Sequence, residues 1–242
     1  MGSSYAEKWW LESAESRALP TPPLVAPYAP NVYFDGRDAV NAAGAVSSWT
    51  DRITAIVATS TDAAHRPLID LSSTSQAVNF DTPLKNCFGF TSALAALADN
   101  GPFTMSARVK LTASSDPDGR QYVGALTGPG LALSRQQGPG RKEQTDRGGL
   151  AFSGTRAIAS NAWLSYLFTY DGAQGTFYLD AVGEAPIAQP NAVVEPFAVH
   201  LGSSAFNTLA MQGLLGDFLV WARVLTSDEI TGMLTYDAGL WS

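Results

Sequence analysis

Apolar and polar residues alternate in short runs from Asn31 to the end of the chain. In residues 103–111 the polar positions alternate with apolar ones, which are Phe103, Met105, Ala107, Val109 and Leu111. Because successive side chains of a strand point to opposite faces, this run predicts a strand with one face buried and the other in water. The same alternation in residues 163–170 and 177–181, on either side of Asp171-Gly172, predicts a β-hairpin.

The end of the chain predicts one more strand and then a helix. Residues 213–221 are mostly apolar and follow the pattern of a buried strand. Thr226 and Glu229 have the spacing of a capping box, so we expect a short helix from there to about Leu234. Because 22 glycines and 14 prolines divide the short apolar runs, the chain predicts an all-β sandwich over residues 31–242.

The N-terminal residues follow a different pattern. Residues 1–18 predict an amphipathic helix with its aromatic side chains along one side, and residues 19–30 contain enough proline to predict an extended arm. So short a helix is marginal in water, and each Trp leaves roughly 150–250 Å² to be covered. We therefore expect this segment to dock, on its own sandwich or on a neighbouring subunit, through Tyr5, Trp9, Trp10 and Tyr28.

Two groups of motifs, in a fixed order over residues 31–238, resemble a known family. The first group is Val32-Tyr-Phe-Asp-Gly, Trp49-Thr-Asp51, Arg66-Pro67 and Val78-Asn-Phe80-Asp81. The second is Tyr170-Asp-Gly, Phe177-Tyr-Leu-Asp180, the strand of residues 213–221 and Leu225-Thr-Ser-Asp-Glu229-Ile230. This order is similar to that of the laminin-G-like members of the concanavalin A-like lectin/glucanase superfamily. The resemblance implies a jelly-roll sandwich. It leaves the function open, because the superfamily includes lectins, glycanases, adhesion modules and viral structural modules.

Composition argues against several classes of function. A net charge of −7 opposes binding to nucleic acid. A single cysteine, Cys87, excludes an internal disulfide and the cysteine-rich zinc sites. No stretch has the pattern of a signal peptide or a membrane span, so we expect synthesis in a host cytoplasm without an export signal.

Catalytic arrangements are missing from the sequence, and we expect that the protein is not an enzyme. Glycanases of the superfamily carry paired carboxylates on one strand, because a retaining mechanism needs two of them about 5 Å apart. Here the strand acids Asp180 and Asp217 stand singly. The two histidines, His65 and His200, have no nucleophile motif around them, and no phosphate-binding loop is present.

Two segments are candidate binding loops. Asp116-Pro-Asp118-Gly119 offers two carboxylates to calcium, the one cofactor that the resemblance suggests, although the same residues fit a solvated turn. The second segment is expected to be a long surface loop that contacts an acidic neighbour or an anionic glycan through Arg135, Arg141, Lys142 and Arg147. Sugar stacking is a further option for three strand aromatics, unless they lie in the core: Trp163, Tyr166 and Tyr178.

Three functions follow from these patterns. The main hypothesis is a structural or adhesive module of a larger assembly, most concretely a bacteriophage virion protein that decorates a capsid or belongs to a head fibre or tail. Such a protein would be located in the virion, form homo-oligomers and dock through its N-terminal arm. The alternative is a carbohydrate-binding, lectin-like module that binds a surface glycan. A glycan-degrading enzyme without recognisable motifs is the least favoured.

Overall fold

The computed structural model of the chain describes residues 29–42, 45–60, 64, 66–72, 75–80, 88–91, 101–112, 121–126, 131–135, 142–147, 150–180, 182–188, 198–202 and 211–240. The expected N-terminal helix and most of the arm lie outside these residues. The first strands are β1 Val32–Asp35, β2 Val40–Ala42, β3 Ala45–Thr50, β4 Val57–Thr59, β5 Leu68–Asp70, β6 Ala77–Phe80, β7 Phe88–Thr91, β8 Phe103–Leu111 and β9 Gln121–Leu126. The others are β10 Leu131–Arg135, β11 Lys142–Arg147, β12 Leu150–Ala157, β13 Trp163–Tyr170, β14 Gln174–Leu179, β15 Val182–Gly183, β16 Ile187–Ala188, β17 Ala198–Leu201 and β18 Gly213–Trp221. The helices are the 3-10 turn η1 Gly36–Asp38 and the α-helix α2 Ser227–Leu240.

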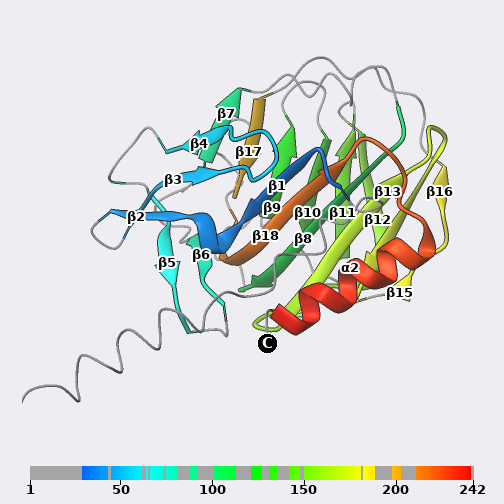
Figure 1. The fold of residues 1–242 in the computed structure, drawn as a ribbon. Helices are drawn as coiled ribbons and strands as arrows, with labels where there is room; N and C mark the ends of the chain where they lie inside the picture. The colour runs from blue at the N-terminus through cyan, green and yellow to red at the C-terminus, as the bar shows by residue number, and fades with distance from the viewer. Residues whose placement is uncertain are drawn as a thin grey trace, which may run out of the picture.

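The strands form two antiparallel layers (Figure 1). The first layer, called here the helix-side sheet, has the strand order β14, β13, β8, β18. On its other edge β18 pairs with both β1 and β6, each along a different part of its length. The second layer, called here the open sheet, runs β4, β7, β17, β9, β10, β11 and β12. β3 pairs with β4 and, through β5, leads back to β6, so one continuous ladder connects both layers. This arrangement is the expected β-sandwich.

The main core lies between the two layers. Its described side chains come from inward-facing positions of both sheets, and β8 and β13 each contribute every second residue. Packing is close at Gly124 of β9, where an added Cβ atom would lie 2.4 Å from the Phe218 ring of β18. The open sheet therefore approaches β18 directly at this position, and only glycine fits there.

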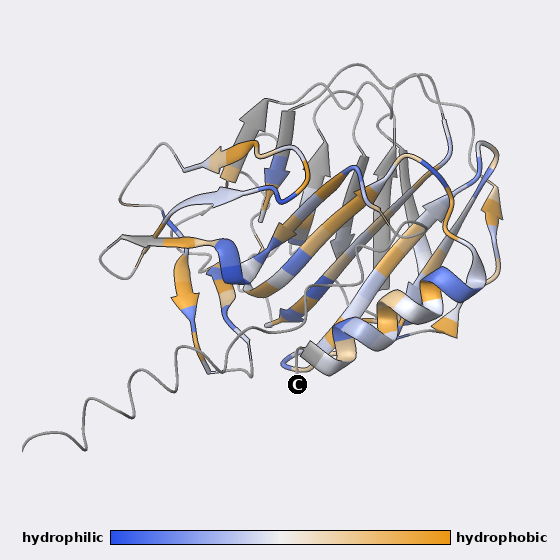
Figure 2. Cartoon of the chain, viewed as in Figure 1, coloured by the Kyte–Doolittle hydropathy of each residue, from blue (hydrophilic) through white to orange (hydrophobic). Residues whose placement is uncertain are grey.

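The strands expected from alternation are present, but one expected exposure is wrong. The strand over residues 103–111, the hairpin around Asp171-Gly172 and the strand over residues 213–221 are confirmed as β8, β13–β14 and β18. The polar face of β8, however, is not in water, because Thr104, Ser106 and Arg108 are all buried. Figure 2 shows the alternation of polar and apolar residues along β8 and the mostly apolar run of β18. A second layer of structure covers the polar face, and alternation alone does not reveal such a cover.

The C-terminal helix begins where the sequence predicts and ends later. The Thr226 hydroxyl accepts a hydrogen bond from the Glu229 N–H at 3.3 Å, and the Glu229 carboxylate accepts one from the Thr226 N–H at 2.8 Å. This is the expected capping box. The helix continues past Leu234 to Leu240, because the next residues contain no proline and only one glycine, Gly239.

Candidate functional site

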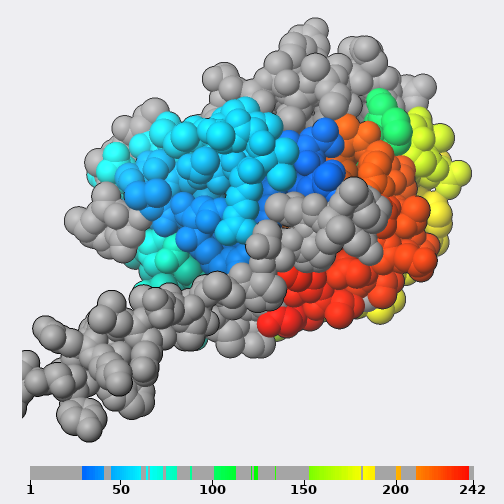
Figure 3. All heavy atoms as spheres, in the orientation of Figure 1, coloured from blue at the N-terminus to red at the C-terminus, as the bar shows by residue number. Residues whose placement is uncertain are grey.

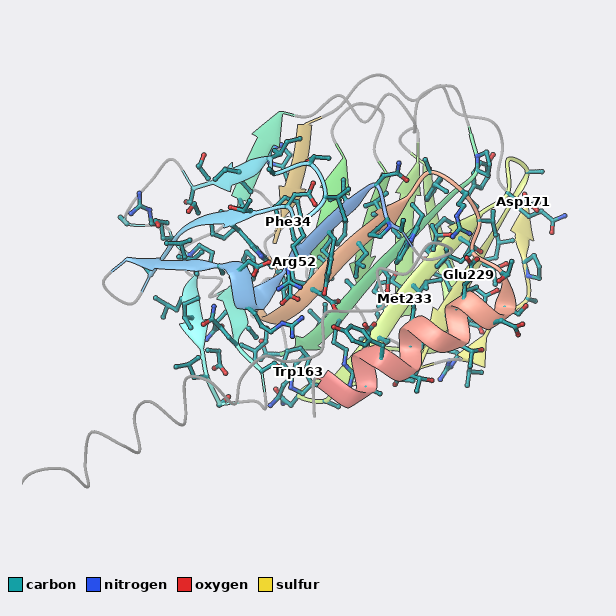
Figure 4. The ribbon with its side chains drawn as sticks, in the orientation of Figure 1. Phe34, Arg52, Trp163, Asp171, Glu229 and Met233 are labelled. Atoms are coloured by element: carbon teal, nitrogen blue, oxygen red, sulfur yellow. The ribbon has the colours of Figure 1, made fainter. Side chains whose placement is uncertain are left out.

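The two sheets present different outer faces. On the helix-side sheet, α2 lies over the strands (Figure 1) and forms the red part of the surface at the lower right of Figure 3. Its side chains Ile230, Met233 and Leu234 pack on an apolar cluster of the strands, which consists of Tyr33, Leu167, Leu219 and Trp221 (Figure 4). Among the described residues, α2 is the one α-helix, and its apolar side chains pack on the helix-side sheet.

Asp35 of β1 is the centre of a buried charged group beside this helix. Its carboxylate accepts a hydrogen bond of 2.8 Å from the Tyr33 hydroxyl. It also forms ion pairs with Arg37 and with Arg52, which is labelled in Figure 4, the second at 3.0 Å. Burial alone raises the pKa of Asp35, but the hydrogen bonds and the charges of the two guanidinium groups outweigh it and lower the pKa. Asp35 is therefore ionised, and the positive charges of Arg37 and Arg52 compensate its charge.

The motifs that carry the family resemblance build this region. Asp51 accepts a hydrogen bond of 2.6 Å from the Tyr33 backbone N–H, and its carboxylate also accepts the Thr54 N–H at 2.9 Å. The Trp49 indole lies in the core with an exposed fraction of 0%. These side chains fix the β3–β4 turn on β1. Their role is structural, since they point into the protein.

Two acids, Asp217 of β18 and Asp237 of α2, lie under the helix. The sequence suggests that Asp217 stands singly, whereas the structure brings Asp237 within hydrogen-bonding reach of it. Their exposed fractions are 1% and 0%, so these carboxyl groups do not meet a solvent-borne substrate. One signal in the sequence was missed: Asp237 lies three and four residues after the apolar Leu234 and Met233, on the buried side of an extended α2.

The open sheet carries one row of paired residues that crosses it from β4 to β12. The row consists of Thr59, Gly89, His200, Ala125, Ala132, Asp146 and Ala151. Thr59 and His200 belong to the outer face, because Thr59 is exposed while the adjacent Ala58 is in the core, and Leu201 beside His200 is also in the core. Most of the row is glycine or alanine, and its ionisable residues are His200 and Asp146.

His200 is the polar residue of this row whose surroundings the structure defines best. Its register partners on the two neighbouring strands are small residues, Gly89 and Ala125. The imidazole is half-buried, and its Nδ1 atom has no hydrogen-bond partner among the described residues. Burial lowers the pKa of His200, so the ring is neutral at pH 7. The Nδ1 atom itself is buried, so a ligand on this face would contact the apolar surface and the exposed edge of the ring.

The basic segment is not the single long loop that the sequence suggests. Arg135 is the last residue of β10, whereas Lys142 and Arg147 are the two ends of β11. Arg135 pairs in register with Glu143. β11 contains no apolar residue, so hydrophobic alternation gave no sign of it, and it is held by pairing with β10 and β12 on both sides. The structure therefore places three of the four basic residues on two strands, and Arg141 lies outside the described residues.

Other candidate residues have different positions. Tyr166 is in the core, where its hydroxyl donates a hydrogen bond of 2.9 Å to the Ser134 carbonyl. Trp163 and Tyr178 are half-buried and pack on small apolar clusters of the helix-side sheet. The remaining candidates lie outside the described residues: Tyr5, Trp9, Trp10, Tyr28, Asp116 and Asp118.

Neither a metal cluster nor a membrane-spanning helix is found in the described part of the chain. No group of three or more His, Cys, Asp or Glu side chains there is arranged to hold a metal ion. No helix in the same part is both long enough and apolar enough to cross a membrane.

In the described part of the chain, an antiparallel sandwich with a C-terminal helix on the outer face of one sheet defines a β-sandwich module of the jelly-roll class. A laminin-G-type family model, described as "Concanavalin A-like lectin/glucanases superfamily", matches residues 88–231, more than half of the chain. The chain belongs to this superfamily. Among curated proteins, no relative matches its sequence.

Solved structures share the fold at low sequence identity. Domain 4 of AbnA, an extracellular arabinanase from Geobacillus stearothermophilus in complex with arabinotriose, is 13% identical with a TM-score of 0.65, covering 85% of this chain and 98% of that domain. A Trypanosoma rangeli sialidase in complex with sialic acid is 17% identical with a TM-score of 0.60, covering 95% of this chain and 37% of the sialidase. The receptor-binding domain of botulinum neurotoxin type G is 10% identical with a TM-score of 0.60, covering 85% of this chain and 51% of that domain. The chain thus corresponds to about half, or less, of the two larger proteins.

Proposed function

We propose that this protein is a non-enzymatic carbohydrate-binding module that holds a glycan across the outer face of the open sheet. The observation that carries this proposal is the row through His200. A sugar ring is flat on one face and carries hydroxyl groups at its edge, so it fits a half-buried neutral imidazole set among small residues. The covered face of the other sheet offers no comparable site, because α2 occupies it.

The fold neighbours supply the choice of sugars for a test. The arabinanase domain is named in complex with arabinotriose and the sialidase in complex with sialic acid. Arabino-oligosaccharides and sialosides should therefore lead a glycan array that is probed with the full chain. We expect retention of at least one of these glycan classes, followed by a dissociation constant measured in solution by calorimetry.

The substitution His200→Ala tests whether the row is the site. Removing the imidazole should weaken binding about tenfold or more, which corresponds to about 1.4 kcal/mol. Asp228→Asn, at an exposed position of α2 on the opposite side, is the matched control and should bind as the parent does. Retention of no glycan, or equal affinity of His200→Ala and the parent, would refute the proposal.

A second candidate function is assembly into a larger particle. Three exposed apolar residues favour it, each on a strand that pairs with β3, with exposed fractions of 51%, 47% and 44%: Val40, Val57 and Leu68. The particle that we propose is a bacteriophage virion, which the chain would join as a homo-oligomer that docks through residues 1–30. Trp9→Ala combined with Trp10→Ala should then abolish oligomerisation, measured by light scattering, while circular dichroism shows an intact sandwich. Unchanged oligomerisation would exclude this docking mode.

A further inference from the structure

Asp217 and Asp237 form a carboxyl pair in the interface between α2 and the helix-side sheet. Asp217 Oδ1 accepts a hydrogen bond of 3.0 Å from the Arg108 backbone N–H, and Asp237 Oδ2 accepts one of 3.3 Å from the Ser165 hydroxyl. Their other oxygens, Asp217 Oδ2 and Asp237 Oδ1, are buried and receive no hydrogen bond from any donor among the described residues. The two side chains are within hydrogen-bonding reach of each other.

The charges around this pair do not neutralise two carboxylates. Arg108 is the cation that acts on both of them, but it also lies 3.5 Å from Asp180 and donates a hydrogen bond of 3.0 Å to the Ser165 hydroxyl. The guanidinium groups of Arg37 in η1 and Arg52 in the β3–β4 turn form ion pairs with other acids, Asp35 and Asp38. Asp35 of β1 also acts on both carboxyl groups, and its charge raises the pKa of each. Two phenols in the described part of the chain, Tyr33 of β1 and Tyr236 of α2, lie near these charges as well.

Two adjacent buried carboxylates that interact with the same guanidinium group would still repel each other, and burial removes their hydration. A proton held between them removes one charge and supplies the donor that both free oxygens lack. We propose that Asp217 and Asp237 share one proton in the folded protein, and that this proton fastens α2 to the helix-side sheet. The interface is then a built-in pH-sensitive contact.

The direction of the pH response follows from linkage. Burial is the main cause that raises the pKa of Asp237 to about 7, and burial together with the neighbouring charge of Asp237 raises the pKa of Asp217. A carboxyl group with a raised pKa binds more protons in the folded state than in the unfolded state, where its pKa is 3.8. Its stabilising effect is therefore complete below about pH 4 and is lost as the pH rises to about 7.

The test compares the full chain with Asp237→Asn. The asparagine amide keeps a donor toward Asp217 at every pH, so the variant lacks this proton dependence. The ratio of the unfolding equilibrium constants, parent over variant, should therefore rise roughly 50-fold between pH 5 and pH 7. His200 titrates with the opposite sign in this range, since its pKa is lowered, and it cancels in the ratio because both proteins contain it.

Asp228→Asn, on the exposed side of the same helix, is the matched control and should give a ratio that does not change with pH. If Asp237→Asn fails to fold, the titration of the pair can still be measured by NMR in the parent chain. In the parent chain labelled with ¹³C at the aspartate carboxyl carbon, one signal that belongs to the pair should titrate near pH 7. A constant ratio for Asp237→Asn, or titration of every aspartate signal below pH 5, would overturn the proposal.

Discussion

The Trp49 indole N–H donates a hydrogen bond of 2.6 Å to the backbone carbonyl of Asp35. This bond joins β3 to Asp35 at the end of β1. The carboxylate of Asp35 is the centre of the buried charged group. The indole also makes edge contacts with Phe34 of β1 and Phe88 of β7, at centroid distances of 5.7 and 6.1 Å. One side chain thus connects β1 and β3 with β7 of the open sheet, which explains why a Trp-x-Asp motif opens the fold.

We predict that Trp49→Phe lowers the free energy of unfolding by about 2–4 kcal/mol. The phenyl ring leaves part of the indole volume empty and leaves the Asp35 carbonyl without its donor in a buried place. Trp163→Phe, at a half-buried position, is the matched control and should cost clearly less. Urea denaturation followed by circular dichroism measures both losses. Equal losses would show that the hydrogen bond to the Asp35 carbonyl does not contribute to the stability of the fold.

The strands of the sandwich were predictable because their apolar periodicity is local. β8, β13 and β18 appear where alternation or an apolar run places them. The polar face of β8 shows the limit of this method: Arg108 looks like a solvent-facing residue in the sequence, yet α2 and the segment before it cover that face. Which face of a strand is covered depends on contacts between segments more than a hundred residues apart, as in the hydrogen bond from the Arg108 N–H to Asp217.

The candidate site was harder to predict than the fold. His200 acquires its surroundings only when β17 pairs with β7 and β9, and those strands come from distant parts of the chain. A shift of the register by one residue would place other side chains beside it. The sequence contains no local motif for such a row. The strand β11 was missed for a related reason, since it has no apolar alternation.

We predict that Gly213→Ala strongly destabilises the fold, by about 3 kcal/mol or more. Gly213 begins β18 with a φ of +131°, and an added Cβ atom would lie 2.1 Å from the Lys110 carbonyl oxygen. Gly239→Ala is the control, because nothing lies within 4 Å of the added atom in α2, and alanine there should stabilise by about 0.5–1 kcal/mol. Thermal unfolding of both variants tests the contrast, which fails if their melting temperatures shift alike.

We predict that Asp35→Asn costs about 3–5 kcal/mol at pH 7. The substitution leaves the Arg37 and Arg52 guanidinium groups without their shared buried partner. The pKa of Asp35 is lowered from 3.8, so its stabilising effect is present above about pH 4 and is lost as the pH falls through the folded pKa. The difference between parent and variant should therefore shrink on acidification. Asp38→Asn, at a partly exposed position, should cost no more than about 1 kcal/mol. Denaturant titrations of parent and variant at pH 7 and pH 3 measure this difference in the free energy of unfolding. A difference that does not change with pH would contradict the prediction.

The start of α2 gives the last prediction, because Glu229 both closes the capping box and binds Arg223. Its two carboxylate oxygens lie 2.7 Å from the two Nη atoms of Arg223, and one of them also accepts the Thr226 N–H. Glu229→Gln keeps the size of the side chain and removes its charge, so we expect a loss of about 1–2 kcal/mol. Burial raises the pKa of Glu229, but the hydrogen bonds from Arg223 and Thr226 outweigh it and lower the pKa from 4.5, so the loss should disappear as the pH falls below that value. Asp228→Asn is the control, because it removes the adjacent charge and Asp228 has no ion pair in the described structure. It therefore separates the effect of the helix dipole from that of the carboxylate bound to Arg223. If both variants lose the same stability, the dipole and not the contact with Arg223 fixes the start of the helix.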